Sequence, residues 1–108
     1  MGGVMPSSKT SSSLVAKRVL ISGKVQGVGF RYALADLARE MNIQGWCRNL
    51  ASGQVEASLQ GETLQVEKLL TWLGQGPPGA LVTQVTIEDQ AVLEPLLGES
   101  IQTFEIRK

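Results

Sequence analysis

The chain has 108 residues, 43% of them hydrophobic, and no apolar run long enough to cross a bilayer, so we expect one soluble domain with one modest core. Ten lysine and arginine side chains balance ten acidic ones, which argues against the strong positive field of a nucleic-acid or anionic-membrane binder. The absence of histidine excludes Ser-His-Asp and Cys-His nucleophile pairs and histidine-bound metals.

The first 16 residues have the composition of a mobile tail. They are rich in glycine and serine and contain no acidic side chain, a pattern typical of segments that bury too little apolar surface to become ordered. They lack the apolar centre of a secretory signal, and the lack of arginine disfavours the alternative of a short organelle-targeting segment. We therefore assign residues 1–16 to a flexible tail and residues 17–108 to the domain.

A strand and a helix are predicted in the first half of the domain. From Val19 to Val25 the side chains alternate between two sides, which is the period of a strand. After a glycine-rich loop the period changes and predicts an amphipathic helix from about Phe30 to Asn42. The apolar face of this helix consists of Leu34, Leu37, Ala38 and Met41.

A hairpin is predicted next. Residues 43–49 return to extended structure, and Gly53 in the following turn is free to adopt a positive φ angle. Alternation in the second arm indicates an antiparallel sheet with one wet face. Its inward residues are Val55, Ala57 and Leu59, and its outward residues are Glu56, Ser58 and Gln60.

The second half of the chain predicts another helix and two strands. The helix repeats the i, i+3, i+4, i+7 spacing and ends at Gly74. Residues 90–100 show no period and are predicted to form a loop. The apolar residues of these elements are Val66, Leu69, Leu70 and Leu73 in the helix, Val85 and Ile87 in the fourth strand, and Phe104 and Ile106 in a short last strand.

This order of elements, βαββαβ, is the plan of a ferredoxin-like α/β sandwich. We therefore predict an α+β fold in which two helices cover one face of an antiparallel sheet. A right-handed crossover makes the first two strands parallel, with the third between them. The loop after Val25 then faces Asn49, at the end of the second strand, across two strand spacings of about 10 Å.

The stretch "GKVQGVGFR", residues 23–31, has the features of an anion-binding loop. Gly27 and Gly29 let the backbone approach a ligand closely, and the helix that follows presents unpaired N–H groups at its positive end. Arg31 adds a planar fork that can hold two phosphate oxygens. Residues 1–50 carry seven basic and two acidic side chains, 7 − 2 = +5, which favours an anion on this half. A turn that binds nothing is the alternative.

Other candidate motifs are weaker. The loop lacks the spacing of a Walker motif and the third glycine of a dinucleotide fingerprint. Cys47 is interpreted as a packing residue rather than a nucleophile, and as the single cysteine it cannot form an internal disulfide, so a cytoplasmic location is expected. Asp36 and Glu40 lie on the polar helix face and are interpreted as solvated surface.

Several stretches together resemble the acylphosphatase family. They are "VQGVGFR", "GWCRN", "SGQVEA", "VEKLLTWLGQGPPGA" and the terminal "FEIRK", which span nearly the whole chain from about Val19. The resemblance implies a ferredoxin-like hydrolase that splits acyl phosphates into a carboxylate and inorganic phosphate. It also implies a small-molecule acyl phosphate as the partner and no metal, cofactor, nucleic acid or membrane. We expect a monomer.

The family's site residues fall on the matched motifs. The resemblance implies that Arg31 binds the phosphate and that Asn49 holds the attacking water. Ser52 departs from the family, because an aspartate is usual before Gly53, and the stretch 90–100 matches only loosely. The phosphate would lie against the backbone of Gln26, Gly27, Val28, Gly29, Phe30 and Arg31.

This activity agrees with the missing histidine. An acyl phosphate expels a carboxylate, which leaves as a stable anion without prior protonation, so positioning and charge stabilisation can suffice. Two rival functions were weighed. One is a carbamoyl-phosphate-handling domain similar to the N-terminal module of hydrogenase maturation carbamoyltransferases, whose further domains are not found in this sequence. The other is a non-catalytic anion sensor, which needs the glycine loop but has no evident need for Asn49.

Overall fold

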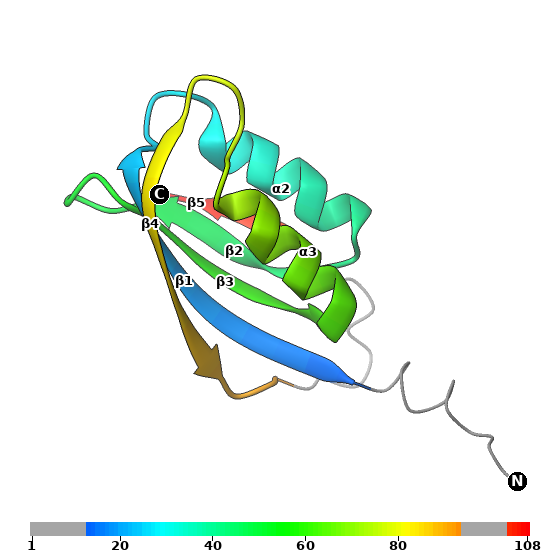
Figure 1. The fold of residues 1–108 in the computed structure, drawn as a ribbon. Helices are drawn as coiled ribbons and strands as arrows, with labels where there is room; N and C mark the ends of the chain where they lie inside the picture. Colours follow the sequence, from blue (N-terminus) through cyan, green and yellow to red (C-terminus); the bar gives the residue numbers. More distant parts are fainter. Residues whose placement is uncertain (1–12, 94–103) are drawn as a thin grey trace, which may run out of the picture.

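The computed structural model describes residues 13–93 and 104–108 of the chain. Two helices lie side by side on one face of a five-stranded sheet (Figure 1). The predicted order of the elements is confirmed. In chain order they are β1 (Leu14–Lys24), α2 (Phe30–Glu40), β2 (Gln44–Asn49), β3 (Val55–Glu62), α3 (Thr63–Leu73), β4 (Leu81–Gln90) and β5 (Phe104–Arg107).

The sheet has the strand order β4-β1-β3-β2-β5. Strand β3 lies between β1 and β2 and is antiparallel to both, so the prediction for the central strands is confirmed. The predicted antiparallel pairing holds for β1 to β4 but does not extend to β5, which runs parallel to β2. Strand β4 pairs with β1 at one edge of the sheet, and β5 lies at the other edge. The chain therefore passes from one edge to the other between these two strands, and β5 runs in the direction opposite to β4. The sheet is therefore mixed.

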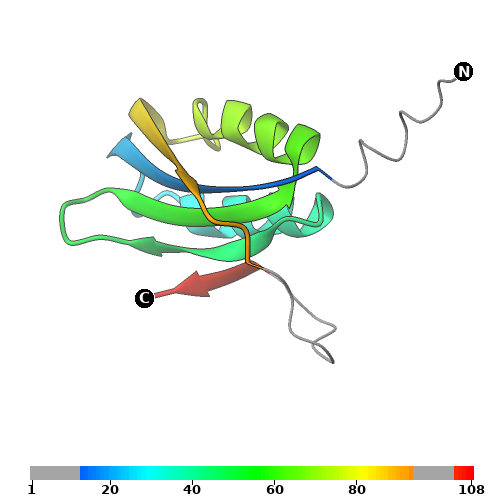
Figure 2. The same cartoon turned by 90° about the horizontal axis from the view of Figure 1, so that it is seen from below.

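The crossing begins on the face of the sheet that the helices leave open (Figure 2). Leu93, three residues after the end of β4, is bound by the Gln60 side chain of β3. The Gln60 Nε2 donates to the Leu93 carbonyl at 2.6 Å, and the Gln60 amide oxygen accepts from the Leu93 N–H at 2.8 Å. Gln60 thus pairs with the crossing chain as a strand backbone would. The rest of the stretch 90–100 from residue 94 on, which was predicted to be loop, lies outside the described residues.

The core lies between the helices and the other face of the sheet. The predicted apolar faces of both helices are confirmed, since α2 packs onto β2 and β5 and α3 packs onto β1 and β3. Phe30 at the start of α2 contacts Trp72 near the end of α3, with ring centroids 5.7 Å apart. The largest fully buried side chains are Phe30, Phe104, Ile21, Leu34, Ile43, Leu59, Leu69, Leu73, Val19, Val25, Val55 and Val66.

Two element boundaries differ from the predicted ones. Strand β1 begins at Leu14, which pairs with Glu62, and Ala16 is buried, so the ordered domain starts three residues before the expected boundary at 17. Helix α2 ends at Glu40 rather than Asn42, because Asn42 adopts a φ of 58°, outside the helical region. Of the predicted flexible tail, residues 1–16, the last three belong to β1, and residues 1–12 lie outside the described part.

Glu56 is the main departure from the predicted wet face of the sheet. Its side chain projects from β3 on the face opposite the helices, yet the residue is only 4% exposed. Two arginines from the neighbouring strands, Arg18 and Arg48, pair with it. Alternation in the sequence predicted the direction of the side chain correctly but not its burial. Among the described residues, no helix is long and apolar enough to span a membrane.

Candidate functional site

The loop between β1 and α2 depends on two glycines. Gly27 and Gly29 both have a φ of 77°, which a residue with a Cβ rarely adopts. A Cβ built at either position would meet no atom within 4 Å, so conformation rather than crowding requires glycine there. The two glycines therefore turn the backbone of residues 26–29 directly into α2.

The first turn of α2 exposes uncompensated positive charge. Gly29 is the N-cap, no side chain caps the helix, and the first turn contains no acidic residue. The earliest intrahelical bond runs from the Ala33 N–H to the Gly29 carbonyl at 3.0 Å, so the N–H groups of residues 30–32 precede the helical ladder. These N–H groups and the helix dipole favour an anion at this end.

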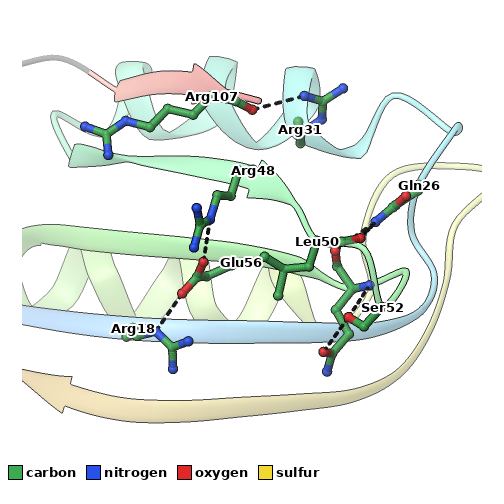
Figure 3. A network of polar contacts seen from close by, with 9 residues as sticks. Arg18, Gln26, Arg31, Arg48, Leu50, Ser52, Glu56 and Arg107 are labelled. Carbon is green, nitrogen blue, oxygen red and sulfur yellow. Dashed lines mark hydrogen bonds and ion pairs between the residues drawn. The ribbon is translucent and has the colours of Figure 1, made fainter.

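Arg31 lies within that turn. Its Nη1 donates to the Arg107 carbonyl of β5 at 3.4 Å (Figure 3), and its guanidinium carbon is 5.9 Å from the centre of the Tyr32 ring. Among the described residues, no carboxylate forms an ion pair with Arg31. A guanidinium has five donors, so this one remains available to an anionic ligand.

Asn49 is the last residue of β2 and carries an unusual acceptor. By strand alternation it lies on the helix-covered side, as does Cys47, which is fully buried. The Oδ1 atom of Asn49 is buried and has no hydrogen-bond partner among the described residues. An unsatisfied buried acceptor of this kind costs about 1 to 3 kcal/mol, so the position is not explained by stability.

Two contacts bring the loop and the end of β2 together, as predicted. The Gln26 Nε2 donates to the Leu50 carbonyl at 2.8 Å (Figure 3), and the Cys47 Sγ lies 3.8 Å from the Arg31 carbonyl, to which it donates. Asn49 stands between Cys47 and Leu50 in the chain. The glycine loop, Arg31 and Asn49 therefore meet at one end of the sheet.

Cys47 is confirmed as a packing residue. Burial raises the pKa of its thiol to about 11, although the charges of Arg31 and Arg39 act in the opposite direction. A thiol with this pKa is almost entirely protonated at neutral pH and is a poor nucleophile. Asp36, the other candidate for acid–base chemistry, has a largely exposed side chain and pairs with Arg39 at 3.8 Å.

A charged cluster lies behind the site on the open face of the sheet. The Glu56 carboxylate accepts from the Arg18 Nε and from the Arg48 Nε, each at 2.7 Å (Figure 3). Burial raises the pKa of Glu56, but the hydrogen bonds and charges of these two arginines outweigh burial, so the pKa lies below its usual value. Trp46 is flanked by the guanidinium carbons of Arg48 and Arg107, 5.5 and 5.0 Å from its ring centre.

The sequence did not predict the side-chain bonds of Gln26 or the pairing of Glu56. The loop motif implies only a backbone role for Gln26. Its side-chain partners are carbonyls 24 and 28 residues away, for which the sequence carries no signal. The charges of Arg18, Glu56 and Arg48 alternate across three neighbouring strands, so they predict the ion pairs only once the strand register is known. Within the described ranges, no group of three or more potential metal-ligating side chains is present.

Comparisons with known proteins point to one family. A family model described as Acylphosphatase matches residues 17–106. A relative from Acaryochloris marina, named Acylphosphatase, is 44% identical over 94 residues, which are 87% of this chain and 95% of the relative. The structure of an acylphosphatase from Coxiella burnetii superposes with a TM-score of 0.79 at 35% identity and covers 92% of this chain and 98% of that one.

A much larger protein is also among the structural neighbours. The crystal structure of full-length HypF in the phosphate- and nucleotide-bound form superposes with a TM-score of 0.75 at 25% identity, covering 89% of this chain but 12% of HypF. The relatives named acylphosphatase instead match over nearly their whole length. The ferredoxin-like fold and the family expected from the sequence are confirmed, and the chain belongs to the acylphosphatase family of enzymes.

Proposed function

We propose a specific mechanism for the acylphosphatase activity of this chain. A phosphate held by Arg31 and by the backbone of residues 26–31 is attacked by a water that Asn49 positions, and no metal takes part. The water oxygen forms a new bond to phosphorus, the bond from phosphorus to the acyl oxygen breaks, and the products are a carboxylate and inorganic phosphate. Both water protons stay with the phosphate.

The phosphate-binding part of the proposal rests on charge and conformation. The loop has two glycines at positive φ and leads into a helix start with no acidic residue and no side-chain cap. A dianionic phosphoryl group would satisfy the free N–H groups there and would compensate the unpaired guanidinium of Arg31. These fixed donors stabilise charge on the equatorial oxygens as the reaction proceeds.

The buried, unpartnered Oδ1 of Asn49 is the single observation that carries the catalytic proposal. A water held by the side-chain amide of Asn49 would have its position fixed while its lone pair remained free to attack phosphorus. Because Asn49 lies beside the loop, that water would sit next to a bound phosphoryl group. Such positioning lowers the entropic part of the barrier.

The leaving group explains why this site needs no imidazole. The expelled carboxylate is a weak base, so it departs without a proton from a general acid. The attacking water can transfer its proton to a phosphate oxygen of the substrate as the new bond forms. Every step then uses donors, charges and positions that the described residues provide, in a chain without histidine.

Hydrolysis of benzoyl phosphate by the wild type and by Asn49→Ala tests the proposal. We expect kcat to fall ~10²- to 10³-fold, the usual cost of losing one preorganised group, while inorganic phosphate still inhibits with a similar constant. Asn49→Asp is the matched control for size, and it should also lose turnover because its negative charge opposes the phosphate. Ordinary hydrolysis by Asn49→Ala would show that this residue does not position the water.

A chelator tests the metal-free part. Treatment with EDTA followed by gel filtration should leave kcat unchanged, and a loss that added Mg²⁺ or Zn²⁺ restores would contradict it. The proposal also includes a monomeric, cytoplasmic enzyme with no nucleic-acid or membrane partner. Balanced charge and a single buried cysteine support this. Light scattering of the pure protein tests the monomer.

A further inference from the structure

We propose that Gln26 is a positioning residue whose side-chain amide fixes the glycine loop relative to Asn49, and that it does not bind the phosphate. This inference rests on the proposed function, because it assigns a role to the spacing between the bound phosphate and the water. It differs from the backbone role that the family resemblance implies for the same residue.

The Gln26 side chain spans the gap between the loop and the β2–β3 hairpin. Its Nε2 donates to the Leu50 carbonyl at 2.8 Å and to the Gln54 carbonyl at 2.9 Å. A primary amide has two N–H donors, so both are used. The remaining Oε1 is an acceptor, and it would repel the oxygens of a phosphate. Gln26 is therefore suited to hold the hairpin and unsuited to bind the substrate.

The hairpin that Gln26 holds is itself rigid. The Leu50 N–H donates to the Gln54 carbonyl at 2.8 Å, and the Gly53 N–H donates to the Leu50 carbonyl at 3.0 Å. The Ser52 hydroxyl, which replaces the aspartate usual in the family, accepts from the Gln54 N–H at 3.3 Å. Because Leu50 directly follows Asn49, a shift of this turn relative to the loop also shifts the Asn49 amide.

The loop needs such a tether because of its own composition. Gly27 and Gly29 give the backbone exceptional freedom. Among the described loop residues 26–29, Gln26 forms side-chain hydrogen bonds to the hairpin. A displacement of about 1 Å between reacting groups can cost about 10²-fold in rate. Binding of phosphate needs only the loop amides and Arg31, whereas attack by water also needs the correct distance to Asn49.

Gln26→Met tests the inference, because methionine has a similar length and no donor. We expect kcat for benzoyl phosphate to fall ~10- to 100-fold, while the inhibition constant of inorganic phosphate changes by less than about threefold. A weakening of phosphate inhibition equal to the loss of kcat would instead show that Gln26 contacts the ligand. An unchanged kcat would also overturn the inference.

Gln60→Met is the matched control. Gln60 also bonds to the backbone through its side-chain amide, but its partner is Leu93, and Gln60 lies near the end of β3 remote from the β2–β3 hairpin. It should lose comparable stability and keep its kcat. If Gln60→Met lost turnover as Gln26→Met did, general loosening of the fold would explain both. Gln26→Asn, which is one methylene too short for both carbonyls, gives a second variant if Gln26→Met folds poorly.

A double variant separates this inference from the proposed function. Once Asn49 is absent, the alignment of its water no longer matters, so Gln26→Met should reduce the residual rate of Asn49→Ala by less than about twofold. Multiplicative losses would overturn the positioning role of Gln26. Retained activity in Asn49→Ala alone would instead refute the water-positioning mechanism, whatever Gln26 does.

Discussion

Two buried polar groups on neighbouring strands differ in their hydrogen bonding. The Glu56 carboxylate of β3 lies on the open face and accepts short hydrogen bonds from two arginines. The Asn49 Oδ1 at the end of β2 lies on the helix-covered side and has no partner among the described residues. A charged group is thus fully paired, and a neutral amide, which is much easier to pair, is left with an orphaned oxygen.

Under the proposed mechanism, the difference separates groups that hold the fold from groups that act on a ligand. Burying an unpaired charge is prohibitive, so Glu56 persists only because Arg18 and Arg48 cover it. An orphaned amide oxygen costs less, and the proposed mechanism assigns the Asn49 amide to the attacking water. Arg31 extends the contrast, because no carboxylate of the described residues pairs with it, whereas Arg18 and Arg48 both pair with Glu56.

The largest expected difference is between the replacement of Arg31 and the replacement of Arg48. Arg31→Gln should lower kcat/KM for benzoyl phosphate by ~10³-fold with little change in the unfolding midpoint, because it removes a charge that acts on the ligand. Arg48→Gln should keep kcat/KM within about fivefold and lower the midpoint, because it uncovers Glu56. Steady-state kinetics and urea denaturation measure both. Equal losses of kcat/KM in the two variants would contradict the proposed difference in role between Arg31 and Arg48.

Glu56→Gln should reduce the free energy of unfolding by about 2 to 3 kcal/mol, the usual cost of breaking hydrogen bonds to a buried charged group. The guanidinium groups of Arg18 and Arg48 would face a neutral amide, and Arg18 would keep only its 3.5 Å contact with Glu88. Chemical denaturation at neutral pH measures the change. Ser58→Ala, on the same strand and face, is the control and should change stability by less than about 1 kcal/mol.

The same carboxylate should make stability depend on pH. The pKa of Glu56 is lower in the folded protein than in the unfolded chain, so its contribution is complete above the unfolded value of about 4.3 and is lost as the pH falls through the folded value. The difference in unfolding free energy between wild type and Glu56→Gln should therefore shrink below about pH 4.3. A constant difference down to pH 2.5 would contradict the pairing.

A smaller effect of the opposite sign is expected for Asn49→Ala. Removing an unsatisfied buried acceptor eliminates a desolvation cost, so the variant should not lose stability and should gain up to about 1 kcal/mol while it loses turnover. Urea denaturation beside the kinetic assay measures both quantities. A clear destabilisation would mean that the Asn49 amide is structural.

The smallest effect is expected at Cys47. Its thiol, with a pKa of about 11, should not react with iodoacetamide at pH 7 until the protein is unfolded. Cys47→Ala should keep kcat and lose about 1 kcal/mol of stability through the lost packing volume. Mass spectrometry after labelling of native and unfolded protein checks the first point. Fast labelling of the native protein would show that the β2 end opens readily.

Much of the site was predictable from the sequence because its parts are local. The two glycines, the helix start and Arg31 lie within nine residues, and glycine spacing together with helix periodicity places them without knowledge of the rest. Asn49 followed from one further step, the βαββαβ order, which brings the ends of β1 and β2 to one edge.

The tertiary structure decided what depends on register and on distant partners. Only strand pairing shows that Glu56 is sealed by arginines 38 and 8 residues away, that Gln26 spans to the β2–β3 hairpin, and that β5 runs parallel to β2. Local sequence fixes dihedral angles and hydrophobic period, whereas hydrogen bonds between remote segments depend on how the strands align. The residue types of the site were thus readable along the chain, and the contacts that hold them in place were not.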